Sequence, residues 1–133
     1  MDQGLEGRSH RFRRTAVADV SIEPDGLIVL RFDQDCRITE SATAEVAAAH
    51  VALAGGSRRP VLADMRGAIS ADRGSRELAA GPDVTAATAR LAILVGNPVT
   101  RVLGNFFLRV STPQYPTRIF NDETLARAWL REA

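Results

Sequence analysis

Short apolar runs alternate with longer amphipathic segments along most of this chain. Residues 15–23 and 27–32 form two such runs, and Pro24-Asp25-Gly26 between them favours a tight turn, because Asp-Gly tolerates positive φ angles. Together they predict an antiparallel hairpin. Further apolar runs bounded by turn residues predict strands at 60–65, 91–95 and 117–120. The run 91–95 shows no alternation, which is typical of a central strand buried on both faces.

Between these strands, apolar residues recur every three or four positions, as on one face of a helix. The predicted helices run to residue 54 from a cap at Thr39 or Ser41, over 70–80 from a cap at Ser70 or Asp72, over 98–110, and onward from Asn121 or Asp122, with a short helical turn over 83–89. In 98–110 the apolar positions form a broad face that could serve as core, dimer contact or pocket wall: Val99, Val102, Leu103, Phe106, Phe107 and Val110.

The resulting element order is β-β-α-β-α-β-α-β-α. Strands that alternate with helices are joined by right-handed crossovers and lie mostly parallel. We therefore predict a single α/β domain over residues 15–133, with a mixed, mostly parallel five-stranded sheet and about four helices. Residues 1–14 lack an apolar pattern and are assigned to a flexible N-terminal tail.

Composition fits one soluble globular domain of 133 residues, 45% of them hydrophobic. All 17 basic residues are arginine, and 16 acidic residues offset them, so we expect no nucleic-acid partner. The local excess at Arg8, Arg11, Arg13 and Arg14 is interpreted as a solvated tail rather than a nucleic-acid-binding arm, which would need aromatic stacking partners. No apolar run reaches the roughly 18 residues of a membrane span. The absence of a secretory signal and the lone Cys36 favour a cytoplasmic location.

The chain offers little for enzyme chemistry. His50 lies within a predicted helix between Val46 and Leu53, and its position favours a packed histidine over a catalytic one. Cys36 follows Asp33 and Asp35, whose negative charge disfavours a reactive thiolate. The sequence contains no recognisable metal-ligand set. We expect no catalytic residue, metal or cofactor.

Two turns follow the carboxyl ends of predicted strands, where open α/β folds bind ligands. The first is the loop 64–76, which we interpret as an interaction or anion-binding surface, with a solvated loop as the alternative; its candidate residues are Asp64, Arg66, Ser70, Asp72, Arg73, Ser75 and Arg76. The second is Gly96-Asn97-Pro98, whose simplest interpretation is the capped start of a helix.

Several segments of the sequence resemble those of a known protein family. They are Val61-Leu62-Ala63-Asp64-Met65-Arg66-Gly67, Gly104-Asn105-Phe106-Phe107, Tyr115-Pro116-Thr117-Arg118-Ile119-Phe120 and Ala128-Trp129-Leu130. With the element order, they are similar to the STAS (anti-sigma-factor-antagonist-like) superfold over roughly residues 15–131. The second half is similar to small bacterial STAS-like proteins grouped with the lipid-transfer (CRAL-TRIO) relatives of that superfold.

The resemblance implies roles for residues of the 64–76 loop. Asp64 stands for the strand-end aspartate of anti-sigma-factor antagonists, and Asp72 for the aspartate that precedes their phosphorylated serine. Arg73 occupies the phosphorylated position and has no hydroxyl. The candidate substitutes are Ser70 and Ser75, since a phosphate near a helix start meets free N–H groups and neighbouring arginines.

We therefore expect a non-catalytic regulatory module that binds a protein partner, for which the resemblance implies an anti-sigma-type kinase. The alternative is a carrier of a small apolar or lipid-like ligand. Leu108 lies off the main apolar stripe and Gly104 permits close backbone approach, which favours a homodimer. The candidate ligand or dimer face comprises Asn97, Phe106, Phe107 and Leu108.

Overall fold

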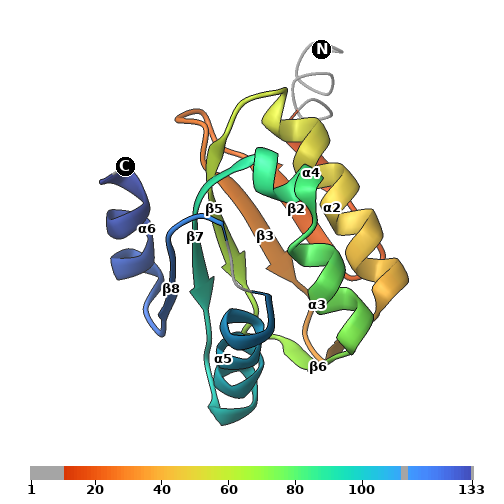
Figure 1. The fold of residues 1–133 in the computed structure, drawn as a ribbon. Coiled ribbons are helices and arrows are strands. Elements are labelled where there is room, and N and C mark those ends of the chain that lie inside the picture. Colours follow the sequence, from red (N-terminus) through yellow and green to blue (C-terminus); the bar gives the residue numbers. More distant parts are fainter. Residues whose placement is uncertain (1–10, 112–113, 133) are drawn as a thin grey trace, which may run out of the picture.

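A mixed six-stranded sheet forms the centre of the molecule (Figure 1). The computed structural model describes residues 11–111 and 114–132. In sheet order, the strands are β1 (Phe12–Arg14), β2 (Ala18–Ile22), β3 (Ile28–Phe32), β5 (Arg59–Asp64), β7 (Thr88–Leu94) and β8 (Thr117–Phe120). The first two neighbouring pairs are antiparallel and the remaining three are parallel. The predicted hairpin is confirmed as β2 and β3, and the most apolar run is β7, an interior strand of the sheet between β5 and β8.

Helices cover both faces of the sheet. They are α2 (Glu40–Ala54), α3 (Arg73–Ala79), α4 (Pro82–Ala86), α5 (Pro98–Ser111) and α6 (Glu123–Arg131). In Figure 1, α2, α3 and α4 lie along one side of the sheet, and α6 stands apart from them beside β7 and β8. The predicted caps Thr39, Asp72 and Asp122 accept hydrogen bonds from the backbone amides of the first turns of α2, α3 and α6.

Successive residues of one strand enter two different cores, because side chains alternate between the faces of a sheet. Val61 and Ala63 of β5 pack in the core that α2 covers, together with Val46 and Ile93. Leu62, which lies between them, packs with Trp129 and Leu130 of α6 and with other residues of the opposite core. The sheet is therefore buried on both faces at its centre, as the continuous apolar runs predict.

A second, two-stranded parallel sheet replaces the start of the helix predicted over 70–80. It pairs β4 (Cys36–Ile38) with β6 (Ala68–Ala71), so Ser70 lies in a strand and Asp72 is the helix cap. Cys36, Ile38 and Ala68 are buried together, which stabilises the extended conformation of both segments. The segment before β6 lies close to the backbone before β4, and this close contact requires glycine at position 67. A Cβ added at Gly67 would lie 2.3 Å from the Asp33 carbonyl oxygen.

The edge strand β1 was also missed by the sequence analysis, which assigned these residues to the tail. All three residues of β1 are exposed, so no apolar alternation marks the strand. Arg14 holds it in place, because its NH1 group donates to Asp19 at 3.0 Å and to Asp33 at 2.8 Å. Residues 1–10 of the predicted tail lie outside the described residues.

Two positions of the apolar face predicted for helix α5 are exposed, while Leu103 of the same face is half-buried. Val99 and Val102 are exposed, whereas Thr100 and Gly104 are buried. A Cβ added at Gly104 would lie 3.3–3.5 Å from side-chain carbons of Ile93, Val95 and Ile119, so this glycine brings α5 close to its own sheet. The use of Gly104 as an argument for a homodimer is therefore wrong.

Candidate functional site

A cavity of about 120 Å³ lies between the sheet and the helices of the α2 side. Its walls are formed by apolar side chains of α2, β3, β5 and β7, among them Leu30, Val46, Val61 and Ile93. Side chains of β4, β6, α3, α4 and α5, together with Met65 and Tyr115, complete the lining. One buried water needs about 10–15 Å³ of such space, and an engineered apolar cavity of 150 Å³ binds benzene. The cavity is therefore large enough for a small organic molecule.

His50 of α2 lines this cavity and is 3% exposed. Among the described residues, its Nε2 atom has no hydrogen-bond partner. Burial lowers the pKa of His50 from 6.5 to about 4, since a charged imidazolium is poorly solvated there, while a hydrogen bond with the Ala87 backbone acts in the opposite direction. The ring is therefore neutral at pH 7. The predicted packing of His50 is confirmed, and its unsatisfied nitrogen is an additional finding.

Thr43 also lines the cavity, and within the described part of the chain its buried Oγ1 atom likewise lacks a partner. Two other hydroxyls of the lining bond to the backbone: Ser75 Oγ donates to the Asp72 carbonyl at 2.7 Å, and Thr88 Oγ1 donates to the Val84 carbonyl at 2.6 Å. The sequence analysis did not single out Thr43. The signal was present, because Thr43, Val46 and His50 share one face of the helix.

A cluster of charged side chains lies on the opposite face of the sheet, where β3 and β5 end. Asp64 Oδ2 accepts a hydrogen bond from Arg31 NH1 at 2.6 Å, and both carboxylate oxygens accept from the Arg66 guanidinium at 2.9 Å. The net effect of these partners is to hold the pKa of Asp64 below its ordinary value, against the opposing effect of burial. Asp64 is thus ionised and fully engaged within the protein.

Glu123, the first residue of α6, joins the same cluster. Its two oxygens accept from Arg31 at 3.0 Å, and Arg66 and Arg127 contribute further bonds at 3.2 and 2.9 Å. Hydrogen bonding to Arg31 is the main reason that the pKa of Glu123 is lowered to about 2. The cluster connects β3, β5 and α6. An anion that bound Arg31 or Arg66 would have to compete with Asp64 and Glu123.

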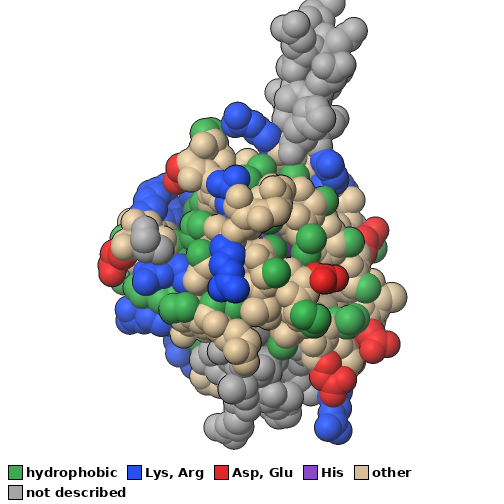
Figure 2. Space-filling model, turned by 45° about the horizontal axis from the view of Figure 1, so that its top comes forward, with side chains coloured by type: hydrophobic (Ala, Val, Ile, Leu, Met, Phe, Trp, Pro, Cys, Tyr) green, Lys and Arg blue, Asp and Glu red, His purple; other side chains and the backbone are tan. Residues whose placement is uncertain are grey.

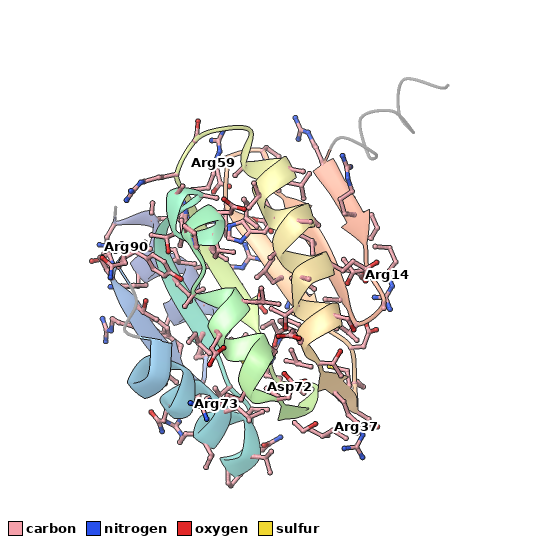
Figure 3. All side chains as sticks on the ribbon, turned by 45° about the vertical axis from the view of Figure 1, so that its right-hand side comes forward. Arg14, Arg37, Arg59, Asp72, Arg73 and Arg90 are labelled. Carbon is pink, nitrogen blue, oxygen red and sulfur yellow. The ribbon has the colours of Figure 1, made fainter. Side chains whose placement is uncertain are left out.

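The remaining residues of the predicted loop site lie on β6 and α3, at the lower end of the molecule in Figure 3, where Asp72 and Arg73 are labelled. Asp72 accepts from the Ser75 amide at 2.8 Å and from the Glu40 amide at 3.1 Å, and so caps α3 while binding the start of α2. The side chain of Arg73 is 83% exposed and lies 3.6 Å from Glu77. Ser70 is half-buried and Ser75 is buried, while the side chain of Arg76 lies outside the described residues.

The second predicted turn is a capped helix start. Asn97 Oδ1 accepts from the Thr100 amide at 2.9 Å, and Thr100 Oγ1 accepts from the Gly96 and Asn97 amides at 2.9 and 3.2 Å. These bonds occupy the amides that would otherwise bind an anion. The side chains of Phe106, Phe107 and Leu108 lie outside the described residues, so the predicted ligand or dimer face stays a prediction.

The remaining observations concern the Cys36 thiol, the charges on the surface and the length of the helices. Burial, and secondarily the charge of Asp33, raises the pKa of the Cys36 thiol, which disfavours a reactive thiolate. The face shown in Figure 2 carries side chains of both charges, with most of the basic ones on the left and in the centre and most of the acidic ones on the right. Within residues 11–111 and 114–132, no helix is long and apolar enough to cross a bilayer.

Comparison with known proteins places the chain in a family. A family model described as a domain of unknown function (DUF7793) matches residues 20–133. The chain belongs to the DUF7793 family. In this DUF7793 protein, the matched region covers the cavity and the charged cluster but begins after β1. No curated protein matches the chain.

Two solved structures resemble the DUF7793 chain. The first is an uncharacterized protein of the DUF3478 family with a SpoIIAA-like fold from Shewanella loihica PV-4, with a TM-score of 0.61 at 15% identity over 85% of this chain and 91% of that chain. The second is a protein of unknown function from Arthrobacter sp. FB24, with a TM-score of 0.34 at 28% identity over 86% of this chain and 92% of that chain. The first likeness shows that the DUF7793 chain has a SpoIIAA-like, STAS-like fold, which confirms the resemblance stated from the sequence.

Proposed function

We propose that this chain is a non-catalytic regulatory module of the cytoplasm that docks a protein partner through β6 and α3. The observation that supports docking is the exposure of Ile69 (42%) and Leu78 (38%) on either side of Arg73 in the sequence. Exposed apolar side chains beside an exposed arginine are typical of the anchors of protein interfaces. The partner class that we propose is an anti-sigma-type kinase, and the proposed assembly of the chain itself is a homodimer.

We propose Ser70, rather than Ser75, as the residue of this surface at which phosphorylation regulates docking. The Ser75 hydroxyl is buried and donates to the Asp72 carbonyl, so a kinase could reach it only after α3 opened. Ser70 lies half-buried in β6, next to the exposed Ile69. A phosphate at Ser70 would add negative charge to the docking surface. It would weaken the binding of an acidic partner and strengthen that of a basic one.

The docking surface is tested by affinity purification from the native cell with four forms of the chain. We expect a specific protein to be recovered with the wild type and with Arg58→Glu, which changes an exposed arginine in the loop between α2 and β5. The same protein should be lost with Arg73→Glu and with Ile69→Asp. Equal recovery with all four forms would show that the partner binds elsewhere, and sedimentation of the wild type measures the proposed homodimer directly.

A second candidate function is the carriage of a small apolar ligand. The observation that favours it is the 120 Å³ apolar cavity beside α2. Native mass spectrometry of protein purified without extraction by organic solvent tests this function. A ligand mass that survives gentle desolvation supports a carrier, while a protein that takes up no small apolar compound in solution contradicts it.

A further inference from the structure

We propose that the cavity beside α2 selects a neutral apolar molecule that carries one hydrogen-bond donor, and that His50 Nε2 accepts this bond. The inference rests on the carrier candidate and adds to it the chemistry of the ligand. It also assigns His50 as the residue that determines specificity.

The first step of the argument is the state of the imidazole. Nε2 is buried without a partner among the described residues, and the ring bonds to the backbone of Ala87. A backbone bond that raises the pKa of a histidine is one in which the ring donates to a carbonyl. The proton of the neutral ring therefore lies on the other nitrogen, and Nε2 is an acceptor that needs a donor.

The second step concerns water, which could also supply a donor. Buried water is retained where it makes two to four hydrogen bonds. The hydroxyls of Ser75 and Thr88 already donate to the backbone, and the other hydroxyl-bearing side chains of the described lining are Thr43 and Tyr115. Thr43 lies two helical turns from His50, about 10 Å along the axis of α2. An apolar ligand with one donor fits this lining better than water, because its apolar part meets the apolar walls.

The third step is charge. The described side chains that line the cavity come from apolar residues, hydroxyl-bearing residues and His50, and none of them is Asp, Glu or Arg. A carboxylate ligand would be buried without a counter-ion and would present no donor to Nε2. The ligand class is therefore a neutral alcohol, phenol or N–H compound rather than a fatty acid anion.

The test uses three probes of similar shape: phenol, toluene and benzoate. Binding to the full chain is measured by ligand-observed NMR and calorimetry at pH 7. We expect phenol to bind, benzoate to bind at least tenfold more weakly, and the phenol-to-toluene affinity ratio to fall at least tenfold in His50→Leu. Ala48→Leu, at an exposed position of α2 that does not line the cavity, is the control and should keep the wild-type ratio.

A direct readout needs no variant, because the chain has only two histidines. Addition of phenol to the wild type should shift the ¹⁵N resonance of His50 Nε2 in the direction of an accepted hydrogen bond, and toluene should not. If phenol and toluene both bind but the ratio is the same in His50→Leu and the resonance is unmoved, the cavity is a carrier site without the proposed selectivity. If none of the probes binds the wild type, the carrier function itself fails.

Discussion

Arg31 and Asp64 are register partners on the adjacent parallel strands β3 and β5, and their side chains meet with Arg31 NH1 2.6 Å from Asp64 Oδ2. The pair lies where α6 begins, and Glu123 of α6 bonds to the same guanidinium. The orientation of the terminal helix on the sheet is therefore fixed by charged groups at one end and by apolar packing of Trp129 and Leu130 at the other.

Asp64→Asn should lower the free energy of unfolding by about 1–3 kcal/mol, because it leaves two guanidiniums without their shared, largely buried carboxylate. The value is below that of a fully buried pair, since both arginines are partly exposed. Urea denaturation at pH 7 measures it. Asp83→Asn, at an exposed position, is the control and should change stability by about 0.5 kcal/mol or less. An equal effect of the two variants would mean that the cluster contributes little.

The stability of the wild type should fall as the pH is lowered from about 6.5 towards 4. The folded-state pKa of His50 is lowered to about 4, so the unfolded chain binds a proton in this range that the folded chain excludes. Between pH 7 and 5 the loss attributable to His50 is about 2 kcal/mol. His50→Leu should remove this part of the loss and leave the loss below pH 4, where Glu123 titrates. Parallel stability curves for the two proteins would contradict the prediction.

Gly67→Ala should destabilise the fold by about 1–3 kcal/mol, because the new methyl group would overlap the backbone of Asp33. The strain would separate β6 from β4 and expose Cys36, which a thiol reagent would detect as faster labelling. Gly74→Ala is the matched control. Its Cβ would meet only the side chain of Glu40, which can move, so both stability and labelling should stay close to the wild type.

Ser75→Glu should lower the free energy of unfolding by about 2–4 kcal/mol, since it places a carboxylate in a buried position beside Asp72. Ser70→Glu should cost less than about 1 kcal/mol, because the Ser70 side chain is only half-buried. Thermal unfolding of the two variants compares these costs. If Ser75→Glu were as stable as the wild type, Ser75 would again be a candidate for phosphorylation.

Local signals were sufficient for the elements that apolar runs or caps specify. The turn at Pro24-Asp25-Gly26, the uninterrupted run ending at Val95 and the cap at Asp122 each depend on a few neighbouring residues. Strand β1 carries no apolar alternation, because it is exposed at a sheet edge. Strands β4 and β6 are short, and their extended conformation depends on packing between Cys36 and Ala68, which are far apart in the sequence.

The candidate sites were predicted less completely, for the same physical reason. Asp64 and Arg66 are close in sequence, but their partners Arg31 and Glu123 come from other elements and meet them only in the folded sheet. His50 was correctly interpreted as packed. Whether its ring nitrogens find partners depends on the space left between α2, α4 and the sheet, which no local pattern encodes. Val99 and Val102 of α5 were assigned to the apolar face but are exposed, whereas Gly104 is buried close to the sheet.

The two outermost strands of the main sheet have a consequence for how copies of this chain can associate. Strand β1 has three residues, two of them arginines, and strand β8 has four, with Arg118 exposed. Short edge strands with arginine side chains disfavour the pairing of a strand from a neighbouring molecule with the edge of the sheet. The domain is thereby protected from fibril-like stacking, and an assembly of copies would form through helices rather than through a continuous intermolecular sheet.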